Sequence, residues 1–146
     1  MLKNKMIDKI LNLLDEAKNN IKHQAEHISA TARNQYEKVI EDWLQIIPNI
    51  EESGLQLYSF SFGASLNPSI DAEFKGKCAD FPIEKWEELA SLNEKNKSLA
   101  LVYNTLKSTF KMYQKIKPDM PEDFYLRIRI RLNPEIRVFI GERPIA

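Results

Sequence analysis

Residues 124–140 read FYLRIRIRLNPEIRVFI, and this stretch decides the fold class. Apolar side chains alternate with polar ones over residues 124–132, which is the period of a β-strand with one buried face. The triplet Asn133-Pro134-Glu135 interrupts the alternation as a turn, and the alternation then resumes over residues 136–140. The stretch therefore predicts an antiparallel β-hairpin with one apolar face.

The same turn pattern occurs earlier in the chain. Leu66-Asn67-Pro68-Ser69-Ile70 and Leu132-Asn133-Pro134-Glu135-Ile136 share L-N-P-x-I at an offset of 66 residues. Applied to the residues before the turns, the same offset pairs the alternating apolar residues of the first hairpin with apolar residues of the second. We infer a tandem αββ duplication, with an N-terminal helical extension over residues 1–15, repeat one over 16–77 and repeat two over 82–143. An internal pseudo-twofold is expected to relate the repeats.

A three-residue turn predicts the register of both hairpins. If Leu66 and Ile70 both face the core, they lie directly opposite each other. In the second hairpin the same rule places Arg131 opposite Arg137. The alternation of the first hairpin also places Tyr58 on the apolar face.

A long helical tract is predicted before each hairpin. Apolar residues recur every three or four positions over residues 2–47 and again over residues 82–116. Pro48 is expected to end the first tract, since proline disfavours helical geometry in the residue before it. Interruptions are expected near His27 and between Asn93 and Asn96. The sequence therefore predicts one α+β domain over residues 1–146 in the order α-β-β-α-β-β. Its four-stranded antiparallel sheet carries long helices on one face, with the strand order left open.

Composition excludes several classes of protein. The chain has 146 residues, 43% of them hydrophobic, and 21 basic side chains balance 21 acidic ones. A net charge of zero removes the global basic field expected of a general nucleic-acid binder. Cys78 is the only cysteine, so an intrachain disulfide is impossible. With no long apolar run in the sequence, we expect a soluble cytoplasmic protein and no membrane partner.

The non-core side of the second hairpin is the best candidate site. It is rich in guanidinium groups and aromatic rings, and we expect partner binding through Tyr125, Arg127, Arg129, Arg131, Arg137 and Phe139. The acidic residues Asp71 and Glu73 of the sister hairpin could neutralise these arginines and leave a solvated surface of mixed charge. Alternatively, the face docks an acidic partner surface or a second copy of the protein.

No catalytic, metal or cofactor site is indicated by the sequence. His23 and His27 are the only histidines; their spacing could hold a metal, but no third ligand is indicated. The glycines are isolated, so no phosphate-cradling loop is expected. We expect neither enzymatic activity nor a cofactor.

The layout resembles that of small bacterial immunity proteins, which neutralise polymorphic toxins. The resemblance rests on a long helix ending at Ile46-Ile47-Pro48, an aromatic-rich hairpin, a second long helix and a final alternating hairpin. It implies a non-enzymatic cytoplasmic inhibitor that binds one cognate toxin domain. The alternatives are a nucleic-acid-binding protein that uses the arginine-rich strand and a small homo-oligomeric domain of another role.

Overall fold

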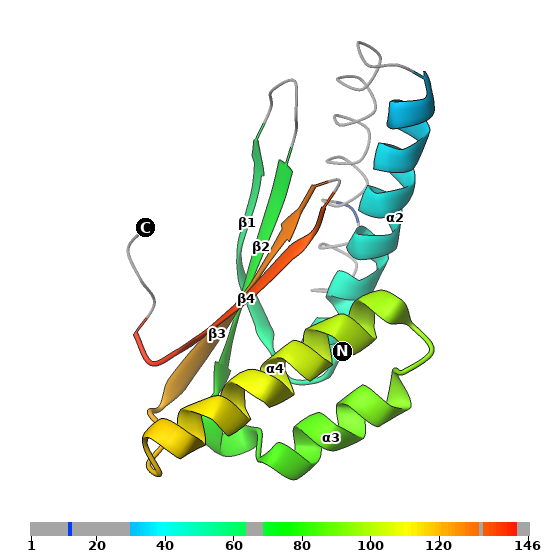
Figure 1. Cartoon of the computed structure of the whole chain (residues 1–146). Coiled ribbons are helices and arrows are strands. Elements are labelled where there is room, and N and C mark those ends of the chain that lie inside the picture. Colours follow the sequence, from blue (N-terminus) through cyan, green and yellow to red (C-terminus); the bar gives the residue numbers. More distant parts are fainter. Residues whose placement is uncertain (1–11, 13–29, 64–68, 132, 143–146) are drawn as a thin grey trace.

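The computed structural model describes residue 12 and residues 30–63, 69–131 and 133–142 (Figure 1). The N-terminal extension and the first part of repeat one, with His23 and His27, lie almost entirely outside these residues. The described elements follow the order helix, two strands, two helices, two strands. They are α2 (Ala30–Glu52), β1 (Gln56–Gly63), β2 (Ser69–Lys77), the 3-10 turn η1 (Cys78–Asp80), α3 (Ile83–Leu92), α4 (Lys97–Ile116), β3 (Asp123–Ile130) and β4 (Glu135–Ile140).

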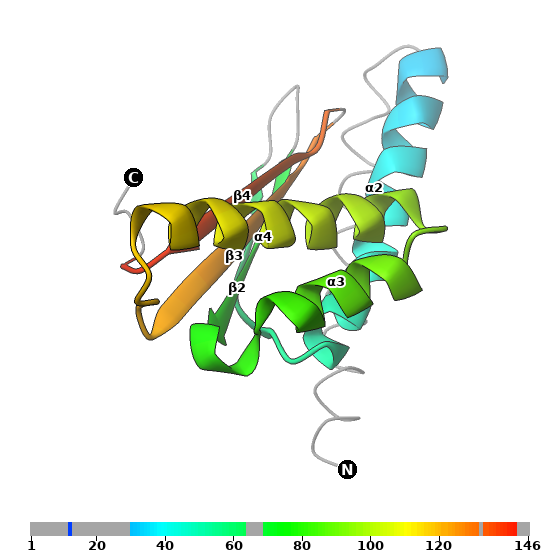
Figure 2. The same ribbon diagram turned by 60° about the horizontal axis from the view of Figure 1, so that its bottom comes forward.

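The four strands form one antiparallel sheet in the order β1-β2-β3-β4. Helices α2, α3 and α4 cover one face of this sheet, and the two views agree on this arrangement (Figures 1 and 2). The core lies between the two layers, where alternate residues of β2 and β3 are almost completely buried. The predicted α+β class, with an antiparallel four-stranded sheet and helices on one face, is confirmed.

An aromatic cluster fills the part of the core between α3, α4 and the sheet. The rings of Trp86 and Phe81 stack with their centroids 4.5 Å apart, and Phe110 and Phe124 meet Trp86 edge-on at 5.3 and 5.7 Å. Gly76 lies opposite Phe124 in the sheet, and a Cβ atom there would come within 2.6 Å of the Phe124 ring. A glycine is therefore required at this position for the Phe124 ring to approach the β2 backbone this closely.

Pro48 does not end α2, which corrects the sequence expectation. The helix continues through the proline to Glu52. Ile47 and Ile50, on either side of Pro48, are both 0% exposed, so burial of this segment outweighs the hydrogen bond that proline cannot donate. The chain leaves the helix at Gly54, whose φ of +114° is readily adopted only by glycine.

The second helical tract breaks where the asparagines predict it. Helix α3 ends at Leu92 and α4 begins at Lys97. The Asn93 side chain donates to the Leu89 carbonyl at 2.8 Å, and Asn96 caps α4 by accepting from the Leu99 amide at 3.1 Å. Side-chain bonds to the backbone thus replace the helical ones over this short connection.

The predicted register is wrong in both hairpins, although the predicted faces of most residues hold. Phe62 lies opposite Ile70, and Ile128 lies opposite Ile136. Arg137 is therefore opposite Arg127 and not Arg131. The observed register pairs Arg129 with Glu135, an opposite-charge cross-strand pair that the three-residue turn would have lost. Faces are preserved because the register shift is an even number of residues.

Tyr58 is on the opposite face from the one predicted. A β-bulge places Leu57 opposite Phe74 and Ser59 opposite Glu73, so that Tyr58 is the extra residue. Leu57 packs against the core instead. The bulge reverses the alternation at this one point and turns the Tyr58 ring to the side away from the helices.

The two hairpins keep the same register at the offset of 66 residues, since Phe62–Ile70 and Ile128–Ile136 are equivalent pairs. The duplication itself stays a prediction. The expected pseudo-twofold is wrong, because a twofold would reverse the strand order of the second copy. In the order β1-β2-β3-β4, the second hairpin is displaced from the first by two strands across the sheet.

Candidate functional site

The side of the sheet away from the helices, here called the outer sheet face, carries most of the predicted site. Strand alternation places Tyr125, Arg127 and Arg129 of β3 on this face beside Arg137 and Phe139 of β4. Arg131 lies beyond the end of β3, where it is exposed in the connection to β4. Strands β2 and β1 complete the face with Asp71, Glu73, Lys75 and Tyr58.

Glu73 is the centre of the outer sheet face and is only 7% exposed. The Arg127 guanidinium donates from Nε to Glu73 Oε1 at 2.9 Å. The Tyr58 hydroxyl donates to Glu73 Oε2 at 2.5 Å, so both carboxylate oxygens are bound. A buried carboxylate needs such partners, because desolvation of an unpaired charge costs several kcal/mol.

Two further ion pairs extend this arrangement toward the turn. Arg129 Nε donates to Asp71 Oδ1 at 2.8 Å, and this bond is the main cause of the raised pKa of Arg129. Arg137 Nε lies 2.8 Å from Glu135 Oε1 within β4. Of the two alternatives that the sequence leaves open, the structure thus contains the ion pairs of the first, between Asp71 and Arg129 and between Glu73 and Arg127.

Aromatic rings lie between the ion pairs. Tyr58 and Tyr125 meet edge to face with their centroids 5.9 Å apart. The Arg127 guanidinium carbon lies 5.3 Å from the centroid of the Phe139 ring, within the range of a cation–π interaction. The outer sheet face thus combines guanidinium groups held in fixed positions with rigid aromatic side chains.

Sequence reasoning missed Tyr58 as a member of this face. The alternation of residues 56–63 gives no sign of the bulge, because Tyr58 reads as an apolar residue in step with Phe60. The available signal was the carboxylate of Glu73 in the middle of a strand with one apolar side, because a carboxylate buried there needs hydrogen-bond donors from neighbouring strands.

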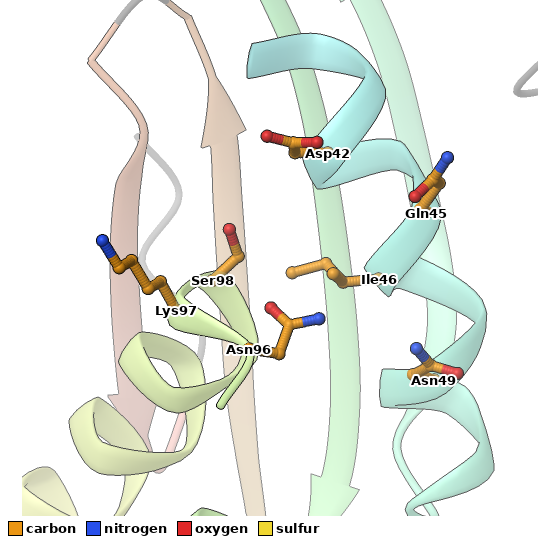
Figure 3. A pocket seen from close by; sticks show the side chains of 7 residues that line it. All are labelled: Asp42, Gln45, Ile46, Asn49, Asn96, Lys97 and Ser98. Atoms are coloured by element: carbon orange, nitrogen blue, oxygen red, sulfur yellow. The ribbon is translucent and has the colours of Figure 1, made fainter. Parts of the chain in front are cut away.

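A groove of about 330 Å³ lies between α2 and the start of α4 (Figure 3). Its lining is polar apart from Ile46 and consists of Asp42, Gln45, Ile46, Asn49, Asn96, Lys97 and Ser98. Asn96 is already bound to the α4 backbone. Asp42 and Lys97 are its titratable residues, and both are exposed, so the groove holds no buried acid or base.

Cys78 is buried, and burial followed by the charge of Asp123 raises its pKa from 9.0 to about 11. The thiolate is the reactive form, so the fraction of Cys78 present as thiolate at pH 8 falls roughly a hundredfold.

We expect an aromatic disulfide reagent to modify Cys78 in the folded protein at least about a hundredfold more slowly than in the urea-unfolded chain. Equal rates would contradict this expectation.

The same shift makes stability depend on pH. As pH rises, the Cys78 thiol ionises in the unfolded chain before it ionises in the folded protein, so the free energy of unfolding should decrease from about pH 9 toward about pH 11.

Within residues 30–63, 69–131 and 133–142, no group of three or more His, Cys, Asp or Glu side chains is placed to hold a metal ion. The predicted histidine pair lies outside the described residues. No helix of the described part has the length and hydropathy needed to cross a membrane. Comparisons with protein-family models, with curated proteins and with solved structures give no match.

Proposed function

We propose that this protein is a non-enzymatic binding module that docks a protein partner on its outer sheet face. The observation that supports this proposal is the fixed row of ion pairs centred on Glu73, with Tyr125 and Phe139 between them. Arginine and aromatic residues held in place before binding lose little side-chain entropy when a partner docks. Such residues supply most of the binding energy at protein interfaces.

The charges of the face favour a protein over a nucleic acid. Binding to phosphates requires cations that can release condensed counterions. Arg127, Arg129 and Arg137 each already bind a carboxylate of this chain. A partner that meets alternating positive and negative groups needs alternating charges of its own, which protein surfaces provide and a phosphate backbone does not.

The resemblance to bacterial immunity proteins supports a finer proposal. In that case the partner is one toxin domain, and docking on the outer sheet face would block the toxin. The cytoplasm is the compartment in which such an inhibitor would act, and the single cysteine is compatible with a reducing environment. Both statements extend the binding proposal and depend on it.

The experiment is site-specific photo-crosslinking in the cells that naturally contain the protein. A benzophenone amino acid replaces Tyr125 at the middle of the outer sheet face, and a matched control carries it at Met112, which is 58% exposed on α4. We expect one protein adduct from position 125 and none from position 112. Exchanging the charges with the double substitution Asp71→Arg and Arg129→Asp keeps an ion pair and should abolish the adduct.

Two results would overturn the proposal. The first is the absence of a protein adduct at position 125, and the second is an adduct that survives the charge exchange. Crosslinked nucleic acid would support the arginine-strand alternative instead. If the adduct contains a toxin domain, cells that express this toxin should grow when the unaltered protein is co-expressed. They should not grow when the charge-exchanged variant is co-expressed instead.

A further inference from the structure

We propose that the free edge of β4 (Glu135–Ile140) pairs with the same edge of a second copy of this chain, joining two four-stranded sheets into one continuous sheet. The interface is the edge of the sheet. It shares Arg137 and Phe139 with the outer sheet face, but its strand pairing does not depend on the partner proposed for that face.

Strand β4 is an edge strand that can accept another strand. It pairs with β3 on one side, and no other described strand pairs with its second side. Edge strands are usually protected by charged side chains, above all lysine, by proline or by a bulge. Residues 135–140 read EIRVFI and contain neither lysine nor proline, and their pairing with β3 is regular. The two charged side chains, Glu135 and Arg137, bind each other. The opposite edge, β1, is bulged at Tyr58 and is therefore the poorer template.

The described residues of the chain cover the apolar side of β4 incompletely. Ile136, Val138 and Ile140 face the core but remain half-buried. Leu126 and Ile128, their neighbours on β3, are 0% exposed because strands flank them on both sides. A strand added beyond β4 would cover the half-buried side chains in the same way, which is the main gain from pairing.

A symmetric antiparallel pair places one residue opposite its own copy, and the sequence of β4 selects which one. With Arg137 at the axis, two guanidinium groups meet directly. With Ile136 at the axis, Pro134 lies within the ladder, where it cannot donate a hydrogen bond. With Phe139 at the axis, Gly141 enters the ladder at a φ of +106°, which is not extended backbone. Only with Val138 at the axis can residues 136–140 pair with the same residues of the second copy while Pro134 and Gly141 stay outside the ladder and the two Arg137 side chains stay apart.

The Val138 register is also favourable in its own right. On the helix side, Ile136 lies opposite Ile140 of the second copy, so the apolar pairs are continuous. On the outer side, Arg137 lies opposite Phe139 of the second copy, where a cation–π interaction can form. A twofold interface of this kind produces a closed dimer rather than an open filament. The zero net charge of the chain means that two copies do not repel each other overall.

The first measurement is the mass of the unaltered protein by light scattering as its concentration is raised. We expect a shift toward twice the 17.0 kDa of one chain. Cysteine crosslinking then tests the register in a Cys78→Ala background. Ile136→Cys, Arg137→Cys and Val138→Cys are oxidised separately, with Ser61→Cys on the β1 edge as the matched control.

We expect at least about tenfold more disulfide-linked dimer from Val138→Cys than from the other three, because only residues at the axis have Cα atoms within about 7 Å of each other. A mass that stays at 17.0 kDa at every concentration overturns the proposal. A maximum at any other position also overturns it. Since the edge is tested without the outer-face partner, failure here leaves the binding proposal intact, and the reverse also holds.

Discussion

Replacing Trp86 with alanine should lower the free energy of unfolding by about 3–5 kcal/mol, which is the range for removing a large buried aromatic side chain. Trp86 is 0% exposed and touches three other rings, Phe81, Phe110 and Phe124. Its removal would leave a cavity between α3, α4 and the sheet that these rigid rings cannot fill. Urea unfolding followed by circular dichroism measures the loss.

Trp86→Phe is the matched control. The indole Nε1–H of Trp86 is buried and has no hydrogen-bond acceptor among the described residues. Phenylalanine keeps an aromatic ring in the cluster and removes this unsatisfied donor, which offsets part of the lost packing. We expect a loss below about 1.5 kcal/mol. If Trp86→Phe were as destabilising as Trp86→Ala, the aromatic cluster would not be the source of the stability.

Replacing Arg127 with methionine should destabilise the protein by about 3 kcal/mol, because it removes the guanidinium group that is hydrogen-bonded to the buried Glu73 carboxylate. The two side chains are only 13% and 9% exposed. Changing both partners to apolar residues, with Arg127→Met and Glu73→Leu, should recover most of this loss, since neither desolvated charge remains. The two single variants and the double variant together form a double-mutant cycle.

Arg137→Met is the control for Arg127→Met. The ion pair between Arg137 and Glu135 is 61% and 49% exposed, and solvent screens such pairs strongly. We therefore expect a change within about 0.5 kcal/mol. Equal losses from Arg127→Met and Arg137→Met would mean that burial does not distinguish the two pairs. The centre of the outer sheet face would then not be held in position by Glu73.

Much of the candidate site could be predicted from strand periodicity. The alternation of β3 places Arg127 and Arg129 on one side and Ile128 on the other, and this follows from the geometry of any extended strand. The acidic residues of β2 could be predicted as their counterions for the same reason. The partners within each ion pair could not, because they depend on the order of the strands.

The register shows where local rules fail. The pattern L-N-P-x-I predicts a short turn, whereas the observed pairing brings Arg129 opposite Glu135 and Ile128 opposite Ile136. These pairs join residues on two strands, and their energies act only when the strands meet. Pro48 is a similar case, because its unfavourable position in α2 is offset by the burial of Ile47 and Ile50 in the core, which forms only when the elements pack together.

The sequence alone determined the described helices and strands and the buried face of most of them, because periodicity and turn residues act through neighbours in the chain. The break between α3 and α4 belongs to this class, since Asn93 and Asn96 bond to nearby backbone groups. Only the tertiary structure decided the strand order, the register and the bulge that brings Tyr58 to Glu73. These features depend on contacts between residues far apart in the sequence, which have no local signature.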